Sequence, residues 1–181
     1  MMKRYTYLNY VCYSMFVMLF IHCGCQQKNT QQQPPSNQEE LEAANRRFLK
    51  LEALDIENFV KRRKLNTIKT GTGVHIDIYK KGTGTVKAEA GKVAVISYTI
   101  SLLNGKKCYE TEPGKPDEFL VEYDDVESGL HEAIQYLHEG DEAIIIIPSH
   151  RAHGIAGDYN KIPSRATIVY DLKLLAVKNY R

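Results

Sequence analysis

The sequence predicts an α+β fold in which a small antiparallel sheet wraps around one short helix. Three observations predict it: alternating apolar stretches from residue 67 onward, glycine- and proline-rich turns between these stretches, and one short helical segment among them. An amphipathic helix and a signal peptide are expected before this domain. A chain of 181 residues has room for one such domain with appendages.

The N-terminus is typical of a secretory signal, expected over residues 1–24. Lys3 and Arg4 precede an apolar segment from about Tyr10 to Ile21, which is too short and too interrupted for a membrane span. Gly24-Cys25 resembles the lipobox of a bacterial lipoprotein, in which Cys25 would be the acylated residue and several acyl chains would anchor the protein. A plain secretion signal, or acylation at Cys23, is the alternative.

Charge and cysteine content restrict the function further. Removal of the signal leaves 22 basic and 22 acidic residues, so we expect no nucleic-acid partner. Only Cys25 and Cys108 would remain after cleavage, and a lipidated Cys25 cannot form a disulfide.

A flexible tether and a helix are expected next. Residues 25–37 are rich in Gln, Asn and Pro, a composition that cannot bury enough apolar surface to fold. Ser36-x-x-Glu39 is a capping-box pattern that begins an amphipathic helix, expected from Gln38 to about Lys64 within the segment 38–66. Its apolar residues recur at helical spacing: Leu41, Ala44, Phe48, Leu51, Leu54 and Phe59. This face could dock on the following domain, which we favour, or mediate self-association.

The domain expected over residues 67–181 begins with a strand at 74–79, which Gly82-Thr83-Gly84 ends. Because this G-x-G lacks a strand-helix context, it does not predict phosphate binding. The remaining expected elements are strands at 92–103, 106–109 and 119–121, a helix at 129–138 that Gly140 ends, and strands at 143–147 and 167–177 that enclose a loop at 148–165.

Seven short motifs occur in one order over residues 71–177. They are Val95-Ile96-Ser97-Tyr98-Thr99, Asn104-Gly105-Lys106-Lys107, Gly129-Leu130-x-x-Ala133-Ile134-x-x-Leu137-x-x-Gly140, Gly140 to Ile147-Pro148, Ala152-His153-Gly154, Ile162-Pro163, and Ala166-x-x-x-Tyr170-Asp171-x-x-Leu174-Leu175. Together they resemble the FKBP-type peptidyl-prolyl cis-trans isomerase family. The resemblance implies an FKBP-like sheet around one helix, a proline-containing polypeptide as substrate, and no cofactor.

The resemblance also implies the site residues. Catalytic positions would be Tyr98, Tyr109, His153 and Tyr170, and substrate-binding positions would be Cys108, Phe119, Val126, Glu127, Leu130 and Ile162. Several positions differ from the family. Cys108-Tyr109 replaces a Phe-Asp pair, which we expect to remove a carboxylate. Glu127 replaces an isoleucine whose backbone N–H meets the substrate, His153 replaces a tyrosine, and Asp117-Glu118-Phe119 replaces a Phe-x-Phe pattern.

The chemistry expected of such a site needs no nucleophile and no metal. Rotation about an X-Pro bond must cross a barrier of roughly 18–20 kcal/mol, and a partly dry pocket with a few hydrogen bonds to the twisted amide can lower it. His150-x-x-His153 has no third ligand at a metal-binding spacing, so we expect no metal site. His131 and His138 are expected at the surface or at a helix end.

Two functions therefore remain open. The first is an exported, lipid-anchored isomerase that assists the folding of envelope or exported proteins, expected to face the periplasm. The second is a non-catalytic FKBP scaffold that docks on a membrane-associated machine. A narrower resemblance, to FKBP-type lipoproteins of Bacteroidota associated with gliding motility, is consistent with either.

Overall fold

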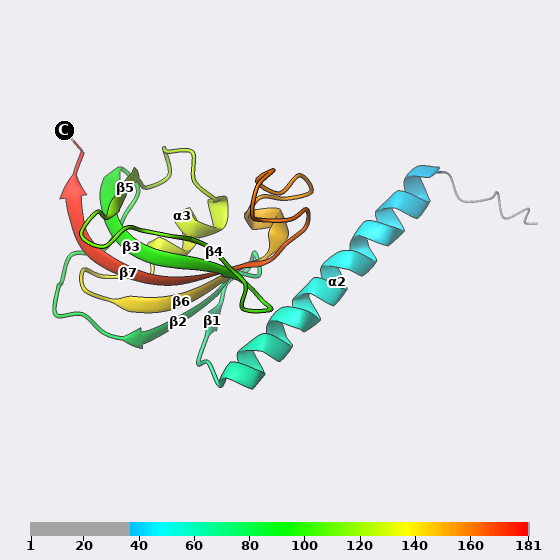
Figure 1. The fold of residues 1–181 in the computed structure, drawn as a ribbon, viewed down its shortest axis with the longest axis horizontal. Coiled ribbons are helices and arrows are strands. Elements are labelled where there is room, and N and C mark those ends of the chain that lie inside the picture. The colour runs from blue at the N-terminus through cyan, green and yellow to red at the C-terminus, as the bar shows by residue number, and fades with distance from the viewer. Residues whose placement is uncertain (1–36, 181) are drawn as a thin grey trace, which may run out of the picture. The chain divides into compact units, whose positions relative to one another are not determined.

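The computed structural model describes residues 37–180, and the expected signal peptide, the lipidation site Cys25 and most of the tether lie outside these residues (Figure 1). The chain divides into two compact units, and the fold below is that of the second unit, Leu41–Arg181. Its first helix, α2 (Asn37–Arg63), starts just before that boundary.

Seven strands form one antiparallel sheet. They are β1 (Ile68–Lys69), β2 (His75–Lys80), β3 (Lys92–Leu102), β4 (Lys107–Glu110), β5 (Asp117–Leu120), β6 (Glu142–Ile147) and β7 (Ile168–Asn179). The order is β1-β2-β6-β7-β3-β4, and β5 pairs with the first half of β3. The expected α+β class and its antiparallel sheet are confirmed; the two-residue strand β1 was not expected.

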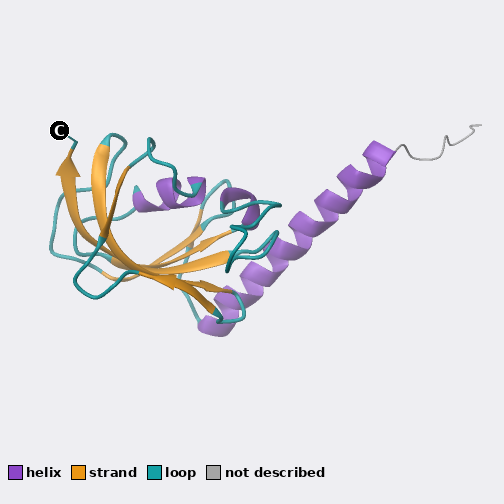
Figure 2. Ribbon diagram, turned by 45° about the horizontal axis from the view of Figure 1, so that its top comes forward, coloured by secondary structure: helices purple, strands orange, loops and turns teal. Residues whose placement is uncertain are grey.

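The two longest strands, β3 and β7, form the centre of the sheet. They pair from Lys92↔Asn179 to Leu102↔Ile168, with a register shift between Val95 and Ile96. A β-bulge bends a strand and increases its twist, and Figure 2 shows the sheet curving around a short helix. This curvature creates the concave side on which the core and the site lie.

The short helix α3 (Ser128–Ile134) packs into that concave side. Leu130, Ala133 and Ile134 are buried in one core cluster with Ile145 and Leu172 of the sheet. The helix is shorter than the expected 129–138, because the residues after Ile134 are held by other contacts. The Asp141 carboxylate accepts the backbone N–H of His138 at 2.9 Å and that of Gly82 at 2.7 Å.

The Gly82-Thr83-Gly84 sequence is explained by close backbone packing. A Cβ atom at Gly82 would lie 2.3 Å from the carbonyl oxygen of Glu139, and one at Gly84 would lie 2.5 Å from the Glu139 Cβ. Only glycine fits at these two positions.

Helix α2 is present where a helix was expected, but its buried residues all lie in its C-terminal half. Ile56 and Phe59 are buried against Ile146 of β6 and Val169 of β7. The residues that the helical spacing placed on a buried face do not all lie on it: Leu41, Leu51 and Leu54 are 66%, 55% and 48% exposed. Spacing alone misassigned them, because the docked face is centred on Ile56. Within residues 37–180, no helix combines the length and the apolar composition needed to cross a bilayer.

Candidate functional site

A cavity of about 520 Å³ opens on the concave side of the sheet, over α3. It is bounded by β3, β4, β5, the segment before α3, and residues 148–167 between β6 and β7, which we call the site loop. Its lining residues are Ile96, Tyr98, Ile100, Tyr109, Asp117, Glu118, Phe119, Asp125, Val126, Glu127, Leu130, Ala152, His153, Asp158, Ile162 and Tyr170.

The floor of the cavity is apolar. Leu130 of α3, Phe119 of β5 and Ile162 of the site loop are each almost fully buried in the main core cluster. The rings of Tyr98 and Tyr170, on the adjacent strands β3 and β7, meet edge to face with centroids 5.4 Å apart. An apolar floor with aromatic walls suits an aliphatic ring such as that of proline.

Each of the three tyrosine hydroxyls in the cavity donates a hydrogen bond to a carboxylate. Tyr98 donates to Asp117 Oδ2 at 2.7 Å, and Tyr170 donates to Glu127 Oε2 at 2.9 Å. Tyr109 donates to Asp158 Oδ2 of the site loop. The tyrosines thereby hold the carboxylates of three different segments at the cavity.

The pKa values of the three tyrosines are raised, whereas that of Asp158 is lowered. Burial, reinforced by Asp117, raises the pKa of Tyr98, and burial together with Glu127 raises that of Tyr170 well above its usual value. The Asp158 carboxylate raises the pKa of Tyr109. Desolvation acts to raise the pKa of Asp158, but hydrogen bonds from Tyr109 and from backbone N–H groups outweigh it and hold this pKa well below its usual value. The three phenols therefore stay protonated as donors, and Asp158 stays ionised.

Glu127 lies at the centre of the polar contacts. It is the N-cap residue of α3, and its Oε1 lies 3.0 Å from His153 Nε2 while its Oε2 accepts from Tyr170. Its backbone N–H donates to no other group in residues 37–180. An N–H before the first turn of a helix has no partner within that helix, so this donor is available to a bound carbonyl oxygen.

The site loop is shaped by its own hydrogen bonds. Asp158 Oδ1 accepts the backbone N–H groups of Asn160 at 2.9 Å and of Ile162 at 2.7 Å. Asp side chains commonly bond the backbone two residues on in this way and fix a turn. The turn points Ile162 into the core while Asp158 still lines the cavity.

His131 supports the opposite wall. It was expected at the surface or at a helix end but is buried, because its ring holds the segment before α3. Nδ1 lies 2.9 Å from the N–H of Glu122 and Nε2 lies 2.9 Å from the carbonyl oxygen of Asp124, so Nδ1 accepts and Nε2–H donates.

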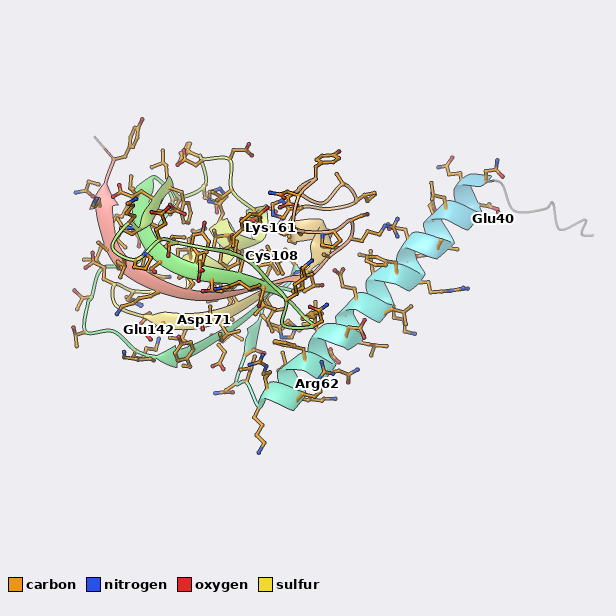
Figure 3. The ribbon with its side chains drawn as sticks, in the orientation of Figure 1. Glu40, Arg62, Cys108, Glu142, Lys161 and Asp171 are labelled. Carbon is orange, nitrogen blue, oxygen red and sulfur yellow. The ribbon has the colours of Figure 1, made fainter. Side chains whose placement is uncertain are left out.

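The structure brings nine of the ten site residues expected from the resemblance to this cavity. They are Tyr98, Tyr109, Phe119, Val126, Glu127, Leu130, His153, Ile162 and Tyr170. Cys108 does not line it. Its side chain is buried in the core beside the site loop, with Sγ 3.6 Å from the carbonyl oxygen of Lys161, and Figure 3 shows these two residues together. Burial raises the pKa of the Cys108 thiol, which makes it a poor nucleophile.

Several lining residues were missed. Tyr109 stands at the position where the resemblance implies a carboxylate, but Asp117, Asp125 and Asp158 bring other carboxylates to the cavity. Asp117 could have been found from strand alternation, because it lies two residues before Phe119 on β5 and so faces the same side. Ile96 and Ile100 share a face of β3 with Tyr98 and could have been found in the same way.

The described residues contain no cluster of side chains that could bind a metal ion. Over residues 37–180, no three His, Cys, Asp or Glu side chains are grouped so that they could bind a metal ion. What the cavity offers is an apolar floor, a free backbone N–H, ring donors and several carboxylates.

Comparisons with known proteins identify the family of this chain. Residues 84–175 match the family model for FKBP-type peptidyl-prolyl cis-trans isomerase. FK506-binding protein 1 of Debaryomyces hansenii is 34% identical over 103 residues, which are 56% of this chain and 92% of that protein. FK506-binding protein 4 of Neurospora crassa is 31% identical over 117 residues, which are 65% of this chain but 25% of the larger protein.

Two solved structures have a similar fold. A peptidyl-prolyl cis-trans isomerase from Pseudomonas syringae pv. tomato superposes with a TM-score of 0.64 at 25% identity, over 74% of this chain and 96% of that one. FkpA from Escherichia coli superposes with a TM-score of 0.62 at 27% identity, over 81% of this chain and 75% of that one.

Proposed function

This chain belongs to the FKBP-type peptidyl-prolyl cis-trans isomerase family, and from that membership we propose that its cavity binds the proline of X-Pro segments and accelerates rotation about the X-Pro bond. One observation carries the proposal: Glu127, whose backbone N–H has no partner within residues 37–180, lines the cavity together with an apolar floor made by Leu130, Phe119 and Ile162. The floor would hold the proline ring and the N–H would bind a substrate carbonyl oxygen.

The rate would come from the change in polarity as the amide twists. The planar amide carries charge separation that water stabilises, and the twisted amide carries less of it. A partly dry cavity therefore disfavours the planar form relative to the twisted one, and preorganised donors hold the substrate in place. Within residues 37–180, no residue needs to form a covalent bond for this chemistry.

The test is a peptide relaxation assay. The cis-to-trans relaxation of a Leu-Pro tetrapeptide would be followed with and without the mature protein, and acceleration at micromolar protein is expected. Absence of acceleration, with the peptide still bound, would instead support a non-catalytic binding module.

We further propose that the mature protein is a lipoprotein of the cell envelope, anchored through Cys25 and facing the periplasm. The N-terminal sequence supports this proposal, with its basic start, its apolar segment and Gly24-Cys25. Its clients would then be exported or envelope proteins.

Cys25→Ala should abolish lipid labelling and release the protein from membranes, whereas Cys23→Ala should leave both the labelling and the membrane association unchanged. Labelling that persists in Cys25→Ala and disappears in Cys23→Ala would contradict this assignment.

Self-association through α2 is a further proposal about partners. Leu41, Leu51 and Leu54 are exposed on the described part of this helix, and their association would remove apolar surface from water. Light scattering of the mature protein should give a mass above that of one chain, and Leu51→Glu with Leu54→Glu should restore the monomer mass. A monomer at high concentration would contradict the proposal.

A further inference from the structure

Helix α2 contacts the site loop directly, although it lies outside the cavity. The loop carries the lining residues Ala152, His153, Asp158 and Ile162. The strand residues on which α2 packs, Ile146 and Val169, lie next to the start and the end of this loop in the sequence. The helix is thus docked at the base of the loop.

One side chain of α2 forms hydrogen bonds to both ends of the loop. Glu52 is a buried residue whose Oε1 accepts the backbone N–H of Ser149 at 2.7 Å and the hydroxyl of Thr167 at 2.8 Å. Ser149 and Thr167 are also buried and are 18 residues apart in sequence. A single carboxylate oxygen of Glu52 therefore joins the two ends of the site loop.

Ser149 connects this contact to His153. Its carbonyl oxygen accepts the backbone N–H groups of Ala152 at 3.1 Å and of Gly154 at 2.8 Å, the two residues on either side of His153. Gly154 has a φ of +62°, a left-handed conformation that glycine adopts without strain. The backbone around His153 is therefore fixed by the carbonyl group of Ser149, the residue whose backbone N–H Glu52 holds.

A second contact supports the same arrangement. The guanidinium of Arg165, near the end of the loop, lies over the ring of Phe48 of α2 at 4.8 Å from its centroid. The N–H of Arg165 donates to the carbonyl oxygen of Gly154 at 2.8 Å, so this contact also leads to the residue after His153.

We infer that Glu52 is a positioning residue, through which α2 holds the site loop so that His153 stays at the cavity. Glu52 does not line the cavity and would not touch the substrate. Its role in activity rests on the proposed function, whereas its role in ordering the loop can be measured without catalysis. A buried donor that loses its acceptor favours a rearranged backbone, which is why removal of Glu52 should move the loop.

The experiment compares Glu52→Ala, Glu52→Gln and Ile76→Val in the mature protein, well below their unfolding temperatures. Ile76 is a core residue of β2 outside the cavity, so Ile76→Val is the control for lost stability. We expect kcat/KM on a Leu-Pro peptide to fall about tenfold in Glu52→Ala, chiefly through kcat, and to stay within about twofold of wild type in the other two. Gln should rescue because its amide oxygen can accept both hydrogen bonds.

Amide hydrogen exchange provides the readout that does not depend on catalysis. The N–H groups of Ala152 and Gly154 should exchange at least tenfold faster in Glu52→Ala than in Ile76→Val, once both are corrected for global stability. If Glu52→Ala does not fold, Glu52→Asp, whose carboxylate is one methylene shorter, takes its place with the same expected changes.

The outcomes separate clearly. Glu52→Ala with wild-type kcat/KM and wild-type exchange at Gly154 would overturn the inference, as would an equal loss of activity in Ile76→Val. Failure of the wild type to accelerate any peptide would contradict the proposed function, and the exchange rates would then decide the positioning role alone.

Discussion

The Glu127 carboxylate lies 3.0 Å from the His153 ring nitrogen and joins α3 to the site loop across the cavity. The same carboxylate accepts the hydroxyl of Tyr170 on β7. The resemblance in sequence implies an isoleucine at the position of Glu127 in the family, and this chain has a polar bridge there. The substitution retains the backbone N–H and adds an acceptor for two neighbouring side chains.

The bridge should contribute to stability. Tyr170 is almost fully buried, so Glu127→Ala leaves its hydroxyl without an acceptor, and we expect the free energy of unfolding to fall by about 1–3 kcal/mol. Tyr170→Phe removes the hydroxyl itself and leaves no buried donor unpaired, so it should lower the free energy of unfolding by only about 0.5–1.5 kcal/mol. Urea unfolding of both single variants and the double variant measures the coupling. Strictly additive effects would show that the two side chains do not interact.

His153 should matter for activity more than for stability. It is partly exposed, it lines the cavity, and its Nε2 lies 3.0 Å from Glu127 Oε1. We expect His153→Ala to lower kcat/KM by roughly tenfold, the effect of about one hydrogen bond. His153→Tyr keeps a donor and adds apolar surface, so kcat/KM should rise roughly threefold. The peptide relaxation assay measures both variants. No change in kcat/KM in either variant would show that His153 does not limit activity and would favour Tyr109 as the limiting position.

The charge around the cavity should select substrates. Asp117, Asp125, Glu127 and Asp158 line it, and within residues 37–180 none of these four has a Lys or Arg partner, whereas Glu118 pairs with Lys178 at 2.6 Å. A Lys-Pro peptide should therefore have a kcat/KM about tenfold above that of a Glu-Pro peptide at low salt. Since the Debye length falls to about 3 Å at 1 M salt, the ratio should approach one there.

Two variants test the origin of this selectivity. Asp125→Asn should lower the Lys-Pro to Glu-Pro ratio by roughly twofold to threefold at low salt. Asp55→Asn makes the same charge change on α2, away from the cavity, and should leave the ratio as it is. A ratio of one in the wild type at low salt would contradict the prediction.

Local patterns were enough to predict most of the sheet. Apolar patterns place β2, β3, β6 and β7 within about two residues of their observed bounds. Alternation indicates a strand that buries one face, and the continuous apolar run of β6 indicates a strand buried on both faces. The end of α3 was not predictable in this way. It depends on the Asp141 side chain, which takes the N–H of His138, and on a close approach to Gly82 that no local pattern encodes.

The candidate site shows the same limit. Cys108 and Tyr109 were both placed at the site by resemblance, yet neighbouring residues of a strand face opposite sides, so only Tyr109 lines the cavity. The partner of Tyr109 is Asp158, 49 residues further along the chain. Glu52 is 97 residues from Ser149. Such pairs follow from the three-dimensional arrangement of the loop and cannot be found from spacing.

A last prediction concerns stability against acid. His75 on β2 is buried, and its Nδ1 lies 3.0 Å from the Thr67 hydroxyl. Burial lowers its pKa, Lys69 of β1 lowers it further, and Glu57 of α2 opposes the shift. Below about pH 6.5 the unfolded chain binds a proton that the folded chain refuses. The stability that neutral His75 contributes is therefore present above that pH and is lost as the pH falls through the folded pKa.

The expected result is a fall in the free energy of unfolding between pH 7.5 and 5.5 that is smaller in His75→Gln than in the wild type. Glu57 does not disturb this window, because the hydrogen bond from Lys69 lowers its pKa from the usual carboxyl value, further away from this pH range. Urea unfolding at pH 7.5, 6.5 and 5.5 measures the slope. His150→Gln changes an exposed histidine and should keep the wild-type slope. Equal slopes in His75→Gln and the wild type would assign the acid sensitivity to other groups.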